Sequence, residues 1–352
     1  MDSLLYLLIG AYTMGLSEGI YVYKFNQETG ESSYVSKVAV DNPSYIETGN
    51  GEYMYAVSEN SGEEESCYAN ALRFDKSKGE LTLLNSQETF AASPCYVIAD
   101  PVRKHVVTAN YAGGSISVFP LQADTLLPVS QLLLFEGTGA DTVRQAMPHL
   151  HCVKLSPDGK YLFAADLGTD MIYRYEVNAK GDASGYVKEE SLKSFKLPPG
   201  SGPRHITFHP NNNYLYLINE LSGAVTGFNY NKDELSQFQT IQADTVGGRA
   251  SADIAVSRDG KFLYASNRNK NDGIAIFSIH PQDGKLTKTG YQSTAKHPRN
   301  FTLTPNGKYL LAACMNSDVI EVYEINANTG LLKKIGKDIT GVDSPVCVKL
   351  VN

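Results

Sequence analysis

The sequence predicts an all-β protein built from seven repeats, and three observations lead to this prediction. Short runs of alternating apolar residues follow polar turns along the whole chain, and no helical periodicity of any length interrupts them. Six of these runs begin 47 to 56 residues apart, at Tyr53, His105, Tyr161, Tyr214, Phe262 and Tyr309. A seventh run, residues 4–9, begins 49 residues before Tyr53.

Each repeat has the same order of four strands. A first strand leads into a tight turn such as Ser156-Pro157-Asp158-Gly159, whose proline and glycine favour chain reversal. The apolar run is the second strand, a third strand ends in an aromatic residue such as Phe119 or Tyr323, and a more polar fourth strand follows. Four strands in about 50 residues match one propeller blade. The sequence therefore predicts a seven-bladed β-propeller, with residues 1–352 as a single domain.

The two ends of the chain predict how the propeller closes. Residues 4–9 form a second strand with no first strand before it, and residues 345–350 form a first strand with no second strand after it. Pairing the two would complete one blade and remove the open sheet edges. Two stacked sandwiches or a solenoid are the alternative folds. The absence of tryptophan argues against the WD40 and quinone-cofactor propellers, whose blades carry tryptophan signatures.

Composition narrows the partners and the compartment. The net charge is −7, from 31 basic and 38 acidic residues, which argues against sequence-independent binding of nucleic acid. No stretch approaches the roughly 18 apolar residues of a membrane helix. The five cysteines include no CxxC pair, which suits a reducing compartment and predicts a cytoplasmic protein. No oligomeric state follows from the sequence.

The repeat alignment also predicts where polar side chains gather. In a propeller the first strands line the central channel, so their starts and the ends of the second strands lie at the same end of it. The polar residues near the first-strand starts are His149, His151, Arg204 and Arg299. Those at or just after the second-strand ends are Asp166, Asn219, Glu220, Asn267 and Arg268. We expect these side chains to converge at one mouth of the channel.

The residue types at this mouth suit chemistry on an anionic substrate. Arginine offers forked donors to phosphate, carboxylate or a developing oxyanion, and histidine or glutamate can act as a general base on water. Taken singly, each arginine also fits a structural ion pair with Glu220 or Asp166, so the convergence carries the argument. His205 and His297 are expected to pack between blades or to lie in loops.

The same patterns argue against a bound metal or cofactor. No spacing of His, Cys, Asp and Glu has the form of a metal site, and no glycine-rich segment precedes a helix. The sequence therefore predicts no metal and no cofactor.

Several motifs in the chain resemble those of a known family. They include Gly10-Ala11-Tyr12-Thr13, Pro148-His149-Leu150-His151, Asp166-Leu167-Gly168-Thr169-Asp170, Gly202-Pro203-Arg204-His205, Asn219-Glu220 and Ser266-Asn267-Arg268. They resemble the propeller-type 6-phosphogluconolactonases, which are grouped with the fungal carboxy-muconate lactonising enzymes. The resemblance covers essentially the whole chain.

The resemblance implies a seven-bladed fold, no metal, and hydrolysis of 6-phospho-glucono-1,5-lactone in the pentose phosphate pathway. The muconate branch implies a cleft histidine, a glutamate and two arginines. The matching positions are His149 or His151, Glu220, Arg204 and Arg268. The remaining polar residues of the mouth, expected to bind the substrate, are Asp166, Asn219, Asn267 and Arg299.

Three functions stay open from the residues alone. The first is hydrolysis of the phosphorylated sugar lactone, which makes the partner a small anionic molecule. The second is a lactonase acting on another sugar lactone, or a cycloisomerase acting on an unsaturated dicarboxylate, because arginine clusters bind phosphate and carboxylate alike. The third is a propeller that binds a ligand without catalysis, since one fold hosts many functions.

Overall fold

Alternating apolar residues form the strands of this protein and positive-φ glycines many of its turns, and the regular secondary structure of the described residues is almost entirely strand. The computed structural model describes residues 3–61, 66–179, 185–232 and 234–352. Within these segments there are thirty strands, one short 3-10 turn (Met315–Ser317) and no α-helix. The strands form seven antiparallel sheets, each with a core of four strands, which confirms the predicted all-β class and the repeat.

Each sheet takes its strands from one continuous stretch of chain, except that the last strand joins the first sheet. The first sheet holds β1 (Leu4–Ala11), β2 (Gly19–Asn26), β3 (Ser32–Ala39) and β30 (Pro345–Val351). The second holds β4 (Ile46–Thr48), β5 (Tyr53–Ser58), β6 (Tyr68–Asp75) and β7 (Glu80–Glu88). The third holds β8 (Pro94–Asp100), β9 (His105–Asn110), β10 (Ser115–Gln122), β11 (Thr125–Leu126) and β12 (Gln131–Leu134). The fourth holds β13 (Leu150–Leu155), β14 (Tyr161–Asp166), β15 (Met171–Val177) and β16 (Val187–Lys196). The fifth holds β17 (Pro203–Phe208), β18 (Tyr214–Asn219), β19 (Ala224–Asn231) and β20 (Glu234–Gln242). The sixth holds β21 (Ile254–Val256), β22 (Phe262–Asn267), β23 (Gly273–Ile279) and β24 (Leu286–Ser293). The seventh holds β25 (Pro298–Leu303), β26 (Tyr309–Cys314), β27 (Val319–Ile325), β28 (Leu332–Lys334) and β29 (Ile339–Thr340).

The chain divides into two compact units. We call the first the terminal unit; it comprises the described residues of Met1–Ser17, Tyr21–Val35 and His205–Asn352. We call the second the central unit; it comprises the described residues of Glu18–Ile20 and Ser36–Arg204.

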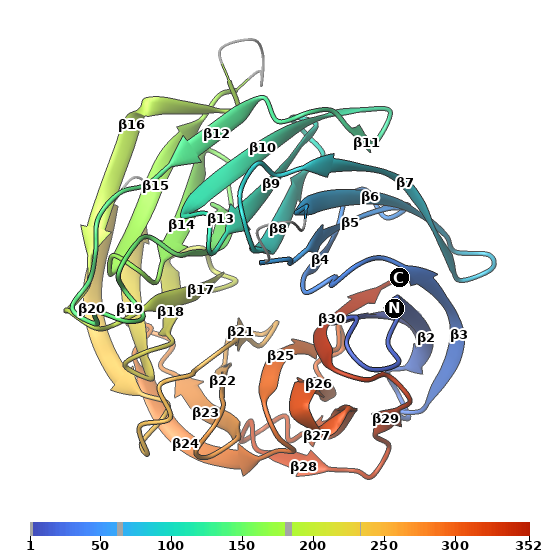
Figure 1. Ribbon diagram of the computed structural model, residues 1–352. Coiled ribbons are helices and arrows are strands. Elements are labelled where there is room, and N and C mark those ends of the chain that lie inside the picture. Colours follow the sequence, from blue (N-terminus) through green and yellow to red (C-terminus); the bar gives the residue numbers. More distant parts are fainter. Residues whose placement is uncertain (1–2, 62–65, 180–184, 233) are drawn as a thin grey trace. The chain divides into compact units, whose positions relative to one another are not determined.

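In the terminal unit the two ends of the chain pair with each other. Strand β30 runs antiparallel to β1 in a register that joins Tyr6 to Val351 and Gly10 to Cys347. Figure 1 shows the N- and C-terminal strands side by side. The predicted pairing of the last strand with the first is thereby confirmed. A buried apolar cluster that includes Phe25 of this sheet and Tyr309 of the seventh packs the two sheets together.

A chain of buried polar contacts links the first strands of four sheets in the terminal unit. His205 Nδ1 in β17 lies 2.8 Å from Asp253 Oδ1, next to β21. The other oxygen of Asp253 accepts a hydrogen bond from Asn300 Nδ2 in β25 (2.6 Å). Asn300 Oδ1 in turn accepts from the Val348 N–H in β30 (2.8 Å). Buried polar groups are stable only when they are paired, so this chain accounts for His205 as a structural residue.

In the central unit the sheets pack through apolar side chains. Tyr55, Val57, Val97 and Phe119 belong to one buried cluster that joins the second and third sheets.

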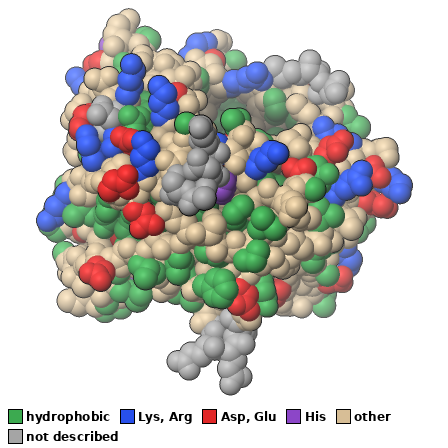
Figure 2. All heavy atoms as spheres, turned by 90° about the horizontal axis from the view of Figure 1, so that it is seen from above, with side chains coloured by type: hydrophobic (Ala, Val, Ile, Leu, Met, Phe, Trp, Pro, Cys, Tyr) green, Lys and Arg blue, Asp and Glu red, His purple; other side chains and the backbone are tan. Residues whose placement is uncertain are grey.

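On the face of the molecule drawn in Figure 2, basic and acidic side chains are interspersed. The described residues contain no helix long and apolar enough to cross a membrane.

Candidate functional site

The layer of residues predicted at the first-strand starts coincides with a repeated irregularity of the sheets. Between first and second strands the register skips one residue in four sheets, and the skipped residues are Cys95, His151, Arg299 and Val346. Two of them, His151 and Arg299, are among the polar residues that the repeat alignment predicts near the first-strand starts. A β-bulge turns a side chain away from the regular alternation of the strand and is common beside functional sites. The bulge at the start of the first strand is therefore a recurring feature of this fold.

In the central unit, His149 is held with one ring nitrogen bonded to the main chain. Its Nδ1 lies 2.9 Å from the carbonyl oxygen of Tyr111, and its ring stacks on the Tyr111 ring with centroids 4.3 Å apart. Because a carbonyl oxygen only accepts, Nδ1 carries the proton of the neutral imidazole, and Nε2 keeps its lone pair. The contacts of His149 thus suit a general base.

His151, two residues further on, lies deeper. It is 5% exposed, its Nδ1 is 3.6 Å from Cys95 Sγ, and its ring meets the Tyr111 ring edge-on. Both histidines therefore contact Tyr111. The Tyr111 hydroxyl oxygen also accepts a hydrogen bond from Arg144 Nη2 (3.3 Å).

Asp166 fixes the segment that carries His149. The carboxylate accepts hydrogen bonds from the His149 N–H (2.7 Å), the Gly168 N–H (2.9 Å) and the Thr169 hydroxyl (2.6 Å). Burial raises the pKa of Asp166 although these donors oppose the rise. Gly168 is required here, because a Cβ at this position would lie 1.9 Å from the carbonyl oxygen of Met147. The Asp166-to-Asp170 motif thus holds the segment that carries His149 in place.

Asp170 connects the same motif to the segment that leads into Arg204. Its carboxylate accepts from the Gly200 N–H and the Gly202 N–H, each at 2.8 Å. Pro203 and Arg204 then begin β17, and Arg204 is 1% exposed, among the largest fully buried side chains of the chain. A buried guanidinium needs polar partners in place of water, so its position is tightly determined.

In the terminal unit, Glu220, Arg268 and His297 form a second group. Arg268 Nη2 lies 3.2 Å from Glu220 Oε2, and both side chains are buried. Arg268 Nε donates to the carbonyl oxygen of Ala250 (2.7 Å), and its Nη1 is 3.2 Å from His297 Nε2. Because arginine only donates, His297 Nε2 is an acceptor here. The guanidinium is therefore oriented by three different partners.

His297 is the residue of this group that the sequence pattern assigned to packing or a loop. Its backbone has φ +66°, and its N–H donates to Asp272 Oδ1 (2.8 Å). The signal that identifies it is its position two residues before the bulge at Arg299, since His149 stands two residues before the bulge at His151. At the same offset, Ser93 precedes the bulge at Cys95 and also has positive φ.

The remaining predicted residues differ in their surroundings. Arg299 is half-buried, with its guanidinium 5.6 Å from the centre of the Tyr12 ring, a cation–π contact. Asn219 donates from Nδ2 to Thr226 Oγ1 (3.0 Å), and Asn267 accepts from Ser251 Oγ at 2.6 Å. Both amides are buried, directly before Glu220 and Arg268 in the chain. That they bind substrate stays a prediction.

The structure therefore brings the candidates into two groups. In the central unit, His149 is joined to Asp166 by a hydrogen bond, and His151 lies beside the same tyrosine. In the terminal unit, Glu220 and Arg268 form an ion pair. Over the described segments, no three His, Cys, Asp or Glu side chains are grouped as metal ligands would be.

Comparisons with known proteins place the chain in a family. The chain is 36% identical to a 6-phosphogluconolactonase of Formosa agariphila, over 91% of its length and 92% of the relative. It is 35% identical to a 6-phosphogluconolactonase of Bacillus subtilis, over 98% and 97% of the two chains. Among solved structures, a 6-phosphogluconolactonase candidate from Bacteroides fragilis is 50% identical, with a TM-score of 0.96 over 100% and 99% of the chains. The periplasmic gluconolactonase of Pseudomonas aeruginosa is 31% identical, with a TM-score of 0.92 over 99% of each chain.

A family model described as a lactonase with a seven-bladed β-propeller matches residues 6–350. The seven sheets agree with that description, and the predicted propeller fold is confirmed. The chain belongs to the lactonase family of seven-bladed β-propellers.

Proposed function

We propose that this protein is a 6-phosphogluconolactonase, which hydrolyses 6-phospho-D-glucono-1,5-lactone to 6-phosphogluconate. The identity of 35–36% to two proteins of that name, over nine-tenths or more of the chain, supports the assignment. The geometric observation that carries it is the buried Arg268, which three partners hold in one orientation. A fixed guanidinium can stabilise the oxyanion that forms when water adds to a lactone carbonyl.

In the proposed reaction His149 acts as the general base. Its Nε2 removes a proton from water while the water oxygen bonds to the lactone carbonyl carbon. The tetrahedral oxyanion collapses, the bond from the carbonyl carbon to the ring oxygen breaks, and the imidazolium returns the proton to the departing ring oxygen. The stacking on Tyr111 and the Nδ1 hydrogen bond hold the ring ready for both transfers.

Arg268 is proposed to polarise the lactone carbonyl, with Glu220 keeping its guanidinium in place. Arg204 and Arg299 are proposed to bind the phosphate, because forked guanidinium donors match its oxygens. Asp166 positions His149 through the main chain, and His151 supports the tyrosine ring on which His149 lies. Asn219 and Asn267 are proposed to act by holding the strand ends that carry Glu220 and Arg268.

The second candidate function is hydrolysis of the unphosphorylated lactone. The likeness to the Pseudomonas aeruginosa periplasmic gluconolactonase favours it, because that enzyme shares the fold over 99% of the chain. That relative is periplasmic, whereas we propose a cytoplasmic location here, because the sequence has an odd number of cysteines, five, with no CxxC pair among them. Fractionation of cells that produce the native chain tests the location.

The decisive experiment measures both lactones with one enzyme preparation. Freshly made 6-phosphogluconolactone and gluconolactone are supplied separately, and the rate above spontaneous opening is recorded. We expect the phosphorylated substrate to have the higher kcat/KM. The H149Q variant should lose about 100-fold or more of kcat, the usual effect of losing a general base. The matched control is H280Q, because His280 is exposed and contacts Asp283 at the surface. Equal turnover by H149Q and the wild type would refute the assignment of the base.

A further inference from the structure

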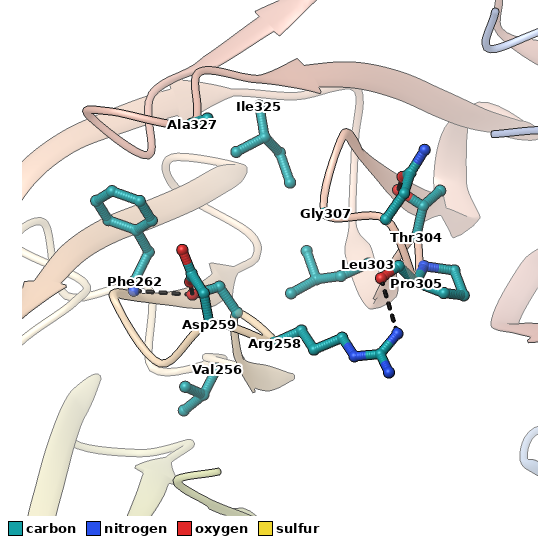
Figure 3. Close-up of a pocket in the computed structure, with 12 residues that line it drawn as sticks. Val256, Arg258, Asp259, Phe262, Leu303, Thr304, Pro305, Gly307, Ile325 and Ala327 are labelled. Atoms are coloured by element: carbon teal, nitrogen blue, oxygen red, sulfur yellow. Dashed lines mark hydrogen bonds between the residues drawn. The ribbon is translucent and has the colours of Figure 1, made fainter. Parts of the chain in front are cut away.

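A pocket of about 600 Å³ lies in the terminal unit, between the sixth and seventh sheets. Figure 3 shows Val256, Phe262, Leu303 and Ile325 around it, with Arg258 reaching to the carbonyl oxygen of Pro305. Phe262 begins β22, whereas Arg268 follows the last residue of that strand. The pocket and the Glu220–Arg268 pair are therefore at opposite ends of one strand, roughly 15–20 Å apart at about 3.3 Å per residue.

The reason for this pocket is visible in the neighbouring pair of sheets, the seventh and the first. There the hairpin Asn26-Gln27-Glu28-Thr29-Gly30 contacts the turn Thr304-Pro305-Asn306-Gly307. Gln27 is 1% exposed, and its Oε1 accepts from the Asn306 N–H at 3.1 Å. Asn306 Nδ2 donates to the carbonyl oxygen of Gln27 (2.7 Å), and the Tyr309 hydroxyl donates to that of Glu28 (3.1 Å). Hydrogen bonds seal this junction.

The hairpin beside the pocket has the same backbone geometry. Asn326 Oδ1 accepts from the N–H groups two and three residues later at 3.0 and 3.1 Å. Asn26 Oδ1 makes the same two bonds at 2.9 and 3.1 Å. In each hairpin the glycine N–H then donates to the asparagine carbonyl oxygen at 2.8 Å. Ala327 thus occupies the position of Gln27 in its hairpin.

The turns on the other side of the two junctions match as well. Ser257 Oγ donates to Asp259 Oδ1 at 2.7 Å, as Thr304 Oγ1 donates to Asn306 Oδ1 at 2.8 Å. Phe262 and its counterpart Tyr309 each donate from the main chain to that hydroxyl oxygen, at 2.9 Å. Asp259 therefore stands where Asn306 stands in the sealed junction.

Three residue differences at equivalent positions distinguish the open junction from the sealed one. Alanine replaces the glutamine that fills the sealed junction, phenylalanine replaces the tyrosine, and aspartate replaces the asparagine. The Asp259 carboxylate accepts hydrogen bonds where the asparagine amide donates them. The open junction offers a main-chain N–H, a carboxylate and an apolar wall, and it lacks the carboxamide that occupies the sealed junction.

We propose that this pocket is a binding site for a small primary carboxamide with an apolar body, such as an aromatic amide. The carbonyl oxygen of the ligand accepts from the Asp259 N–H, as Gln27 Oε1 accepts from Asn306. The amide NH2 donates to the Asp259 carboxylate, which also holds the Lys261 ammonium at 3.2 Å and accepts from the Ser257 hydroxyl. A ligand carboxylate has no proton to donate at this place. The apolar body packs on Phe262, Leu303 and Ile325. A pocket of this size and composition is typical of small-molecule sites.

The test uses benzamide as the probe and benzoate as its isosteric control, with binding followed by chemical-shift titration of the full chain. Wild type should bind benzamide at least tenfold more tightly than benzoate. A327Q should weaken benzamide binding at least tenfold, because its own carboxamide takes the place of the ligand's. A327S is the matched control, since serine is too short to reach Asp259, and it should bind as the wild type does.

A second variant tests the same reasoning from the sealed side. Q27A should open space at the sealed junction, so that benzamide also shifts the resonances of Glu28 and Tyr309, which do not line the first pocket. An absence of saturable benzamide binding to the wild type overturns the proposal. Equal affinity for benzoate, or unchanged affinity in A327Q, also overturns it. If Q27A does not fold, the A327Q and A327S pair still decides, and neither result depends on lactonase activity.

Discussion

The ion pair between Glu220 and Arg268 makes the most demanding prediction. Its closest atoms are 3.2 Å apart, and the two side chains are 7% and 6% exposed. At an effective dielectric constant of about 20, two unit charges at this distance attract by about 5 kcal/mol. Removing one partner of a buried pair typically costs about 3–5 kcal/mol, because the other charge is left buried without its partner. E220A should therefore lower the free energy of unfolding by about 3–5 kcal/mol.

A double-mutant cycle measures the interaction itself. E220A, R268A and the double variant are unfolded in urea, and their free energies of unfolding are compared with that of the wild type. The double variant should cost less than the sum of the two single variants, by about 0.5–3 kcal/mol. Turnover should fall by a similar factor in all three variants, because residues that act as one unit lose their effect together.

The outcome that refutes this reasoning is additivity. If the free energies of the two single variants add up to that of the double variant, the two side chains do not stabilise each other. If E220A retains wild-type turnover while R268A does not, Glu220 does not orient the guanidinium. The conservative variant E220Q keeps an acceptor near Arg268 and should lose less stability than E220A. Comparing the two variants distinguishes the effect of removing the charge of Glu220 from the effect of removing its side chain.

Three further predictions concern other parts of the chain. G168A should reduce kcat at least tenfold, because the added Cβ displaces the histidine segment. G336A is the control: a Cβ added at Gly336 meets no atom within 4 Å, and the backbone φ there is +71°. This variant should lose only about 1–2 kcal/mol of stability and no activity. H297A should lower kcat about tenfold, because it removes the acceptor that orients the Arg268 guanidinium. H297N should restore part of the lost kcat, since asparagine tolerates positive φ and carries an oxygen acceptor. Equal losses of kcat in H297A and H297N would show that His297 has a merely structural role. Burial opposes ionisation of Glu321, but hydrogen bonds from Lys334 and other donors outweigh it and lower the pKa. Its stabilisation is therefore present above the unfolded-state pKa of about 4.5 and is lost as pH falls through the folded-state pKa, so E321Q should flatten the acid limb of a stability–pH curve measured in urea.

The repeat made most of the fold predictable. Polar turns and alternating runs identified the second strands within one residue of their starts, as at Tyr53, Tyr161 and Tyr309. The equivalence of turns also identified the bulge layer that holds His151 and Arg299, although alternation by itself says nothing of bulges. First strands were harder to predict, since β4 and β21 are three residues each and carry little periodic signal.

The details of the candidate site were less predictable for a physical reason. A residue's position in a repeat defines the strand end at which it lies, but not the atoms with which its side chain bonds. The amides of Asn219 and Asn267 bond to buried hydroxyl groups, and this follows from the side chains that lie beside them. His297 contacts Arg268 from a different sheet, 29 residues along the chain, which no local pattern records.

The pairing of β30 with β1 has a consequence for the time course of synthesis. The register joins residues 6 and 351, and closing so long a loop costs about 5 kcal/mol of chain entropy. At 5–20 residues per second, a ribosome takes roughly 20–70 s to reach the last strand after it has made the first. Throughout that interval β1 lacks its final partner, and its open edge is available to any other extended chain. The newly made protein is therefore most exposed to wrong pairing before its final residues leave the ribosome, and least exposed once they have.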